Sequence, residues 1–197
     1  PYRIYGGQRF YERLEIRNAL AYLRLAQTRD DDPALERVLN TPPRGIGSKT
    51  VEKIREVARA EQIPMWQAIH RTREQSLLPA RALTALGNFQ ALIDDLDRSS
   101  ETLPLDELTE HVIEVTGLLD YHRSEKGERG QARVENLQEL VTATRLFEPE
   151  DEEISPLQAF LDSAALDAGE GQADPYEDSI QMMTLHSAKG LEFPMVF

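Results

Sequence analysis

Apolar residues return every three or four positions along most of the chain, the spacing that places them on one face of an α-helix. Each such stripe predicts a helix with one buried face, so we interpret these residues as core. Five helices are predicted by the following apolar positions: Leu14, Ala19, Leu20 and Leu23; Val51, Ile54, Val57 and Ala58; Leu83, Leu86, Phe89, Ile93 and Leu96; Leu105, Leu108, Val112 and Val115, closed by Gly117; and Val134, Leu137, Leu140 and Val141. The sequence therefore predicts a mainly α fold.

Prolines predict the start of two further helices. Proline is well placed in a first helical turn, because its missing N–H would have had no partner there. A short helix is expected from Pro64, with Trp66 and Ile69 facing inward. Ser155 and Pro156 are typical of an N-cap and a first helical residue. The helix that follows them carries these apolar residues: Leu157, Phe160 and Leu161.

The two ends of the chain have a different pattern. Residues 2–5 and 180–185 are short, strand-like runs, and residues 190–197 lead into another. The simplest interpretation is a helical domain inserted into a sheet-containing domain. The chain would then hold the insertion and two short pieces of its host, and we expect it to be an excised fragment.

Three polar stretches interrupt the helical pattern. Residues 28–33 (TRDDDP) and 148–153 are interpreted as loops, the second from its run of charges. Residues 168–178 (AGEGQADPYED) are rich in glycine and acids, which is typical of a domain-boundary linker.

The charge of the chain is unevenly distributed. The net charge of −13 over 197 residues argues, on its own, against a nucleic-acid binder. Residues 1–59, however, hold 12 Lys and Arg against 8 Asp and Glu, a balance of +4, and the remainder holds 10 against 27, or −17. The affinity for phosphate depends on the charge of the local surface, so a negative net charge does not exclude DNA binding. Residues 148–178 carry 11 acids and no Lys or Arg. We interpret this acidic stretch either as solvated charge without a function or as a surface for a basic partner.

Composition limits the other classes of site. The chain has no cysteine, which excludes disulfides and Cys-based zinc sites and favours a reducing compartment, the cytoplasm. No apolar run approaches the ~18 residues of a membrane span, so no membrane contact is expected.

Residues 41–50 read TPPRGIGSKT and have some features of a nucleotide-binding loop. That loop needs G-x-x-x-x-G-K-[ST] after an apolar strand. Here Ser48 separates Gly47 from Lys49, no glycine lies five positions before Gly47, and prolines stand where the strand would be. The motif occurs nowhere else in the chain. We therefore expect no ATP hydrolysis by this chain alone.

A hairpin that contacts a DNA backbone fits the same residues better. Gly45 and Gly47 lack a Cβ, so their backbone can take positive φ and approach a phosphate closely. Ile46 would anchor the turn in the core, and a helix beginning near Ser48 would point its free N–H groups at the phosphate. Charge and a hydroxyl would come from Arg44, Lys49 and Thr50. A tight interhelical turn, with glycine serving only as a cap, is the alternative.

Four motifs in order resemble one protein family. They are GGQRFYERLEIRNALAYLRL (residues 6–25), TPPRGIGSKT (41–50), RGQARVENLQEL (129–140) and TLHSAKGLEF (184–193). Together they resemble the UvrD/Rep/PcrA group of superfamily 1 DNA helicases over essentially the whole chain. In that family two RecA-like motor domains, 1A and 2A, carry the insertions 1B and 2B.

The resemblance implies a domain assignment. Residues 6–178 correspond to the helical subdomain 2B, with a helix-hairpin-helix-like GIG element. Residues 1–5 and 179–197 correspond to short β stubs of the RecA-like domain 2A, the second of which holds motif V.

The resemblance also implies roles for individual residues. Contact with duplex DNA is implied for Arg17, Arg44, Gly45, Ile46, Gly47, Lys49 and Thr50. In motif V, Thr184 and His186 correspond to positions beside the single strand, and Glu192 to the acid that meets the ribose of ATP. Further candidates for DNA contact are Arg13, Tyr121, Arg129 and Arg133. Arg24 is interpreted as part of a solvated helix face, and no catalytic or metal role is assigned to His70, His111 and His122.

The implied parent protein is an ATP-dependent 3′-to-5′ DNA helicase of DNA repair in the bacterial cytoplasm, at the nucleoid. ATP and Mg²⁺ would bind outside this chain. The 2B subdomain would contact the duplex at a junction with single-stranded DNA and swivel on hinges at residues 6–7 and 168–178. Its acidic surface implies weak binding by the chain alone, with a shallow salt dependence.

Two other functions stay open. The subdomain could act mainly as an autoinhibitory module that docks repair proteins, namely mismatch-repair factors, excision-repair factors and RNA polymerase. An independent enzyme would require ATPase activity from this chain itself.

Overall fold

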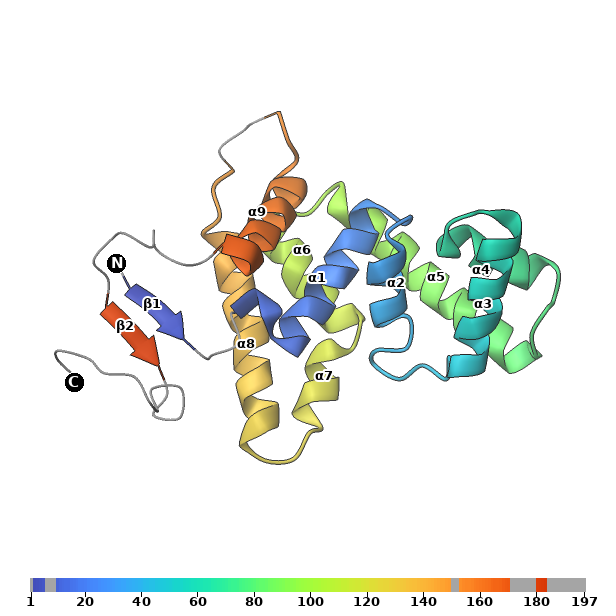
Figure 1. Ribbon diagram of the computed structural model, residues 1–197, viewed down its shortest axis with the longest axis horizontal. Coiled ribbons are helices and arrows are strands. Elements are labelled where there is room, and N and C mark those ends of the chain that lie inside the picture. Colours follow the sequence, from blue (N-terminus) through green and yellow to red (C-terminus); the bar gives the residue numbers. More distant parts are fainter. Residues whose placement is uncertain (1, 6–9, 150–152, 171–179, 184–197) are drawn as a thin grey trace.

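The computed structural model describes residues 2–5, 10–149, 153–170 and 180–183, and most of its elements are helices (Figure 1). In chain order they are β1 (Tyr2–Tyr5), the 3₁₀ helix η1 (Phe10–Glu12), α1 (Leu14–Gln27), α2 (Asp32–Val38), α3 (Ser48–Glu61), α4 (Met65–Glu74), α5 (Ala80–Ser100), α6 (Leu105–Val115), α7 (Leu118–Arg123), α8 (Glu128–Arg145), α9 (Pro156–Glu170) and β2 (Ile180–Met183). The prediction of a mainly α fold is confirmed.

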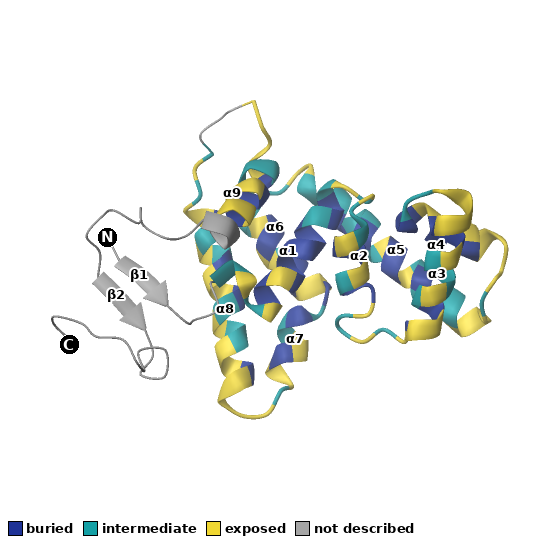
Figure 2. Cartoon of the chain, in the orientation of Figure 1, coloured by how far each residue is buried: buried dark blue, intermediate teal, exposed yellow. Residues whose placement is uncertain are grey.

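Helix α1 is the central element of the helical body. It contacts α2, α5, α6, α8 and α9, and buried residues lie along most of its length (Figure 2). Ile16, Tyr22 and Leu23 have no exposed surface. Because α1 is enclosed on several sides, its buried positions exceed the single stripe expected of a surface helix.

Helices α3 and α4 form a pair at the end of the body away from the strands (Figure 1). The pair joins the rest through α5 and α2, both of which contact α4. The Oδ1 atom of Asp32 accepts a hydrogen bond of 2.8 Å from the backbone N–H of Met65, which links the starts of α2 and α4. Trp66 and Ile69 are buried in α4, as the sequence predicts.

Helix α2 begins inside the stretch interpreted as a loop, so that interpretation is wrong at its end. The Oδ1 atom of Asp31 accepts a hydrogen bond of 2.9 Å from the N–H of Ala34, and Pro33 lies in the first turn. An aspartate N-cap followed by proline is a helix-start signal. The helix has only seven residues, too few for a repeated apolar stripe.

Other boundaries also differ from the predictions. Helix α7 follows Gly117 directly, and α9 continues to Glu170, into the stretch interpreted as a linker. Leu14 and Val115 are 47% and 41% exposed, although both were interpreted as core. They are the first residue of α1 and the last of α6, so each lies at a helix end.

Strands β1 and β2 pair in parallel, with Tyr2 opposite Ile180 and Tyr5 opposite Met183. Parallel strands require a crossover between them, and here the helical residues form that connection. Their membership of a RecA-like sheet stays a prediction, as do the domain boundaries at residues 5/6 and 178/179.

Candidate nucleic-acid interface

The predicted hairpin lies in the loop between α2 and α3 and is held by the side chain of Asn40. The Oδ1 atom of Asn40 accepts hydrogen bonds from the backbone N–H of Arg44, at 2.8 Å, and of Ile46, at 3.2 Å. Ile46 is 1% exposed, so its side chain anchors the turn in the core as expected. Gly45 and Gly47, on either side of it, are exposed. The loop therefore displays its glycine backbone to solvent and buries the residue between them.

Arg44 is directed inward by its contacts. Its Nη1 donates to the carbonyl oxygen of Pro42 at 2.9 Å, and its Nη2 to that of Thr116 at 2.6 Å. The guanidinium carbon lies 5.6 Å from the ring centre of Tyr22 and 6.0 Å from that of Phe89. These contacts stabilise the loop against the core. They engage the guanidinium group of Arg44, for which the sequence predicts contact with DNA.

Tyr22, which is buried in α1, also bonds to the same loop. Its hydroxyl donates to the carbonyl oxygens of Thr41, at 2.7 Å, and Val38, at 3.2 Å. Burial raises the pKa of Tyr22 far above its ordinary value, so the hydroxyl keeps its proton even at strongly alkaline pH.

The two glycines of the hairpin differ in conformation. Gly45 has φ +79°, a left-handed conformation that is strained for any residue with a side chain. Gly47 has φ −81° and ψ 171°, which any residue adopts, and a Cβ added there would meet no atom within 4 Å. Within the described part of the protein, nothing about the fold requires glycine at position 47.

Helix α3 begins at this exposed backbone. Gly47 is its N-cap and supplies no side chain to the first N–H groups. The N–H of Thr50 bonds to the carbonyl oxygen of Gly47, whereas those of Ser48 and Lys49 point out of the first turn, as at any helix start. Lys49 is exposed and forms no ion pair with a described residue. Thr50 is 7% exposed, so its side chain faces the protein.

The candidates near α8 lie in a network of polar side chains. Arg133 Nη1 lies 2.5 Å from Glu125 Oε1, and its Nε lies 3.5 Å from Glu15 Oε2. Asn136 donates to Glu15 Oε1 at 2.6 Å and accepts from Arg13 Nη1. Arg13 and Arg133 are therefore engaged within the fold.

The same network includes a buried histidine, His122. Its Nδ1 lies 2.8 Å from Glu125 Oε1, and this hydrogen bond, followed by that of Arg133, holds the pKa of Glu125 below its ordinary value. Tyr121 and Arg129 lie nearby and are exposed. A Cβ on Gly130 would lie 2.5 Å from the carbonyl oxygen of Glu125 and 2.7 Å from that of His122, so α8 approaches this turn closely.

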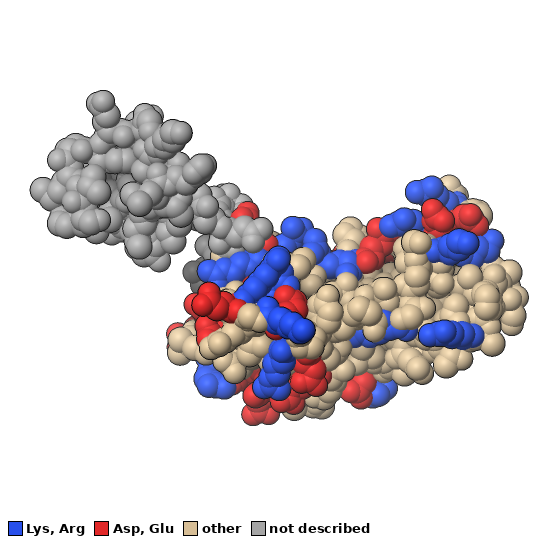
Figure 3. Space-filling view, turned by 90° about the horizontal axis from the view of Figure 1, so that it is seen from below, with Lys and Arg blue, Asp and Glu red and all other residues tan. Residues whose placement is uncertain are grey.

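Basic side chains also lie on α1. Arg17 is exposed, and its side chain has no hydrogen bond or ion pair with a described residue. Arg24 Nη1 lies 3.8 Å from Asp31 Oδ2, on the surface. Figure 3 shows Lys and Arg side chains gathered on one part of the described surface, with Asp and Glu side chains beside them.

Other predicted residues lie outside the described part of the chain, namely Thr184, His186 and Glu192. Among the residues that are described, no helix is long and apolar enough to cross a membrane. No group of three or more His, Asp or Glu residues in these ranges could hold a metal ion.

Sequence reasoning did not identify Asn40 or Arg37 as candidates. An Asn that follows a helix and precedes a turn is a recognisable signal, because its side chain commonly bonds to nearby backbone N–H groups. Arg37 comes close to Arg17 only through the packing of α2 on α1, and no local pattern reports that proximity.

The chain matches known proteins over its whole length. Residues 1–197 match the family described as UvrD-like helicase C-terminal domain. The chain is 55% identical to DNA helicase II of Escherichia coli (strain K12) over 199 residues, covering all of this chain and 28% of that protein. It is 40% identical to the ATP-dependent DNA helicase PcrA of Bacillus subtilis (strain 168) over 202 residues, covering all of this chain and 27% of that protein. The chain thus spans little more than a quarter of each relative.

Proposed function

Because the chain belongs to the family of UvrD-like helicase C-terminal domains, we propose that it forms the duplex-contacting 2B part of an ATP-dependent 3′-to-5′ DNA helicase. The parent helicase would bind ATP and Mg²⁺ largely outside this chain, with Glu192 meeting the ribose and Thr184 and His186 beside the single strand. It would act in DNA repair. This chain would hold the duplex ahead of the fork and swivel against the motor domains.

The conformation of Gly47 is the observation that carries the proposal. Neither its φ nor the space around it calls for glycine, and Ser, Thr, Asp or Asn would cap α3 better. Close approach of a phosphate to the backbone gives glycine a reason there, because a side chain would stand between the phosphate and the N–H groups of Ser48 and Lys49.

Each hairpin residue has a separate role in this proposal. Gly45 provides the left-handed turn, and Ile46 fixes the hairpin to the core. Lys49 supplies the exposed charge. Arg44 positions the loop through its contacts with Pro42 and Thr116. The proposed DNA contacts are made with the phosphate backbone, so binding would depend on DNA shape and salt more than on base sequence.

A substitution of Gly47 by Asp tests the proposal. The aspartate suits the N-cap and should raise the free energy of unfolding by a few tenths of a kcal/mol, while its charge repels a phosphate. We expect the variant to lose affinity for forked DNA at low salt, measured by fluorescence anisotropy with single-stranded DNA in parallel. Gln138→Glu, which adds the same charge on the exposed side of α8, is the matched control. Wild-type affinity in Gly47→Asp would refute the duplex contact.

The alternative function is an autoinhibitory and protein-docking module, supported by the acidic residues 148–178. It predicts that Gly47→Asp leaves fork binding unchanged. Replacement of the acidic residues by neutral ones would then weaken association with a basic repair protein.

A further inference from the structure

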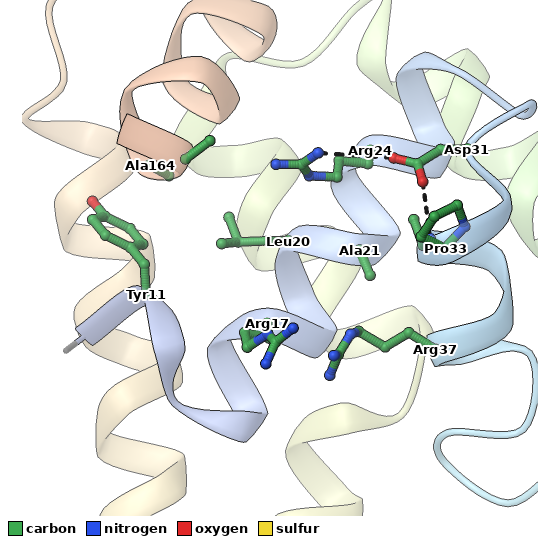
Figure 4. Close-up of a pocket in the computed structure, with 11 residues that line it drawn as sticks. Tyr11, Arg17, Leu20, Ala21, Arg24, Asp31, Pro33, Arg37 and Ala164 are labelled. Carbon is green, nitrogen blue, oxygen red and sulfur yellow. Dashed lines mark hydrogen bonds and ion pairs between the residues drawn. The ribbon is translucent and has the colours of Figure 1, made fainter. Parts of the chain in front are cut away.

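A cleft of about 270 Å³ opens between α1, α2 and α9 (Figure 4). The apolar residues that line it include Leu20, Ala21 and Ala164. Three arginines line it, of which Arg17 and Arg24 come from α1 and Arg37 from α2. The cleft thus brings three guanidinium groups together beside a few apolar side chains.

The side chains of Arg17 and Arg37 point toward one another among the residues that line this cleft (Figure 4). The side chain of Arg17 has no partner among the described residues. Among the described residues, the side chain of Arg37 has one hydrogen bond, from Nη1 to Asn18 Oδ1 at 3.5 Å, the long limit for such a bond. Partial burial, and after it the charge of Arg17, lowers the pKa of Arg37. Two like charges are therefore held close together with little compensation.

The neighbouring carboxylates are occupied elsewhere. Asp31, the carboxylate among the described lining residues, pairs with Arg24 and caps α2 through the N–H of Ala34. Glu36 precedes Arg37 in the chain, but its Oε1 lies 2.5 Å from Arg55 Nε. An anion from outside the chain that bound between the two guanidinium groups would attract both of them and so offset their mutual repulsion.

We propose that Arg17 and Arg37 bind one phosphate-class oxyanion between them, and that the oxyanion is a phosphodiester group of the duplex. Planar guanidinium groups suit phosphate oxygens because each can donate two parallel hydrogen bonds. The assignment to DNA rests on the proposed function. It is supported by the path of the chain, since Arg37 lies in the last turn of α2 and Asn40, three residues later, holds the Gly45–Gly47 loop. The protein would thus grip the backbone at two points.

The oxyanion site is tested first without DNA. Thermal unfolding of the 197-residue chain is compared in sodium phosphate and sodium chloride at equal ionic strength and pH. Phosphate should raise the wild-type midpoint, because a ligand that binds only the folded state stabilises it. Arg37→Gln and Arg17→Gln should lose that rise and unfold no earlier than wild type in chloride. Arg98→Gln, which removes an exposed arginine paired with Asp95, should keep it.

The source of the oxyanion is tested with forked DNA over a range of salt concentrations. The Arg17→Gln/Arg37→Gln variant should reduce the slope of log affinity against log salt by about one unit, the value for one phosphate contact. Arg37→Lys should retain part of the slope, because lysine keeps the positive charge but lacks the planar guanidinium group that donates two parallel hydrogen bonds. A phosphate-dependent midpoint with an unchanged slope would identify free phosphate as the ligand and overturn the assignment to DNA.

The outcomes separate this proposal from the hairpin's role. If Arg37→Gln weakens fork binding while Gly47→Asp does not, the cleft binds DNA and the hairpin does not. Equal phosphate stabilisation of wild type and Arg37→Gln, together with an unchanged salt slope, would overturn the cleft site whatever Gly47→Asp does.

Discussion

The Nη2 atom of Arg44 donates a 2.6 Å hydrogen bond to the carbonyl oxygen of Thr116, which follows α6 and lies 72 residues further along the chain. This contact joins the hairpin loop to a distant helix end. It explains how a loop rich in glycine and proline can hold a fixed conformation. A rigid loop would bind phosphate with less loss of conformational entropy than a flexible one.

Replacement of Arg44 by Lys should therefore destabilise the fold. The lysine keeps the charge but cannot reach several carbonyl oxygens at once or stack between Tyr22 and Phe89. We expect a loss of about 1–3 kcal/mol in the free energy of unfolding, measured with urea, because buried acceptors lose their donors. Unchanged stability, accompanied by weaker DNA binding, would mean that Arg44 contacts phosphate directly.

The two hairpin glycines should respond differently to alanine. Gly45→Ala forces a side chain into the left-handed region and should cost about 1–2 kcal/mol. Gly47→Ala places its methyl group in open space at an ordinary φ, so the free energy of unfolding should hardly change. Urea unfolding of both variants checks the difference, and similar losses in the two would contradict the loop geometry.

Gly130 should be intolerant of alanine because backbone atoms surround it. An added Cβ would lie 2.5 Å and 2.7 Å from two carbonyl oxygens, and repacking should cost about 1–3 kcal/mol. Gly87 is the matched case within α5, where the nearest atom, at 2.9 Å, is the flexible end of Arg73. Gly87→Ala should therefore cost less, as measured by thermal unfolding. A larger loss for Gly87→Ala would contradict the close contact at Gly130.

The stability that Glu125 contributes should depend on pH. Its pKa in the folded protein is lowered, chiefly by the hydrogen bond from His122 and then by Arg133. A lowered folded pKa means that this stability is present above the ordinary value of 4.5 and is lost as pH falls through the folded pKa. The difference in unfolding free energy between wild type and Glu125→Gln should thus narrow below about pH 4.5. A difference that widens on acidification would contradict the network.

Helical periodicity was sufficient to predict the long helices, since α5 and α8 repeat their apolar spacing over several turns. It could not reveal α2 or α7, which are too short for a repeat. The burial of Ile46 was predictable from its position between two glycines. The inward direction of Arg44 was not, because its acceptor at Thr116 and its ring partner Phe89 are distant in sequence. The Arg17–Arg37 pair depends in the same way on the packing of α1 against α2.

The central claim, that the hairpin contacts the duplex backbone, is tested most directly by an NMR titration of the amide groups. The 197-residue chain is titrated with a short duplex at low salt, and the backbone signals are followed. The account predicts that the amides of Gly47, Ser48 and Lys49 shift early and together, and that added salt reverses the shift. Signals that stay in place there while others move would contradict it.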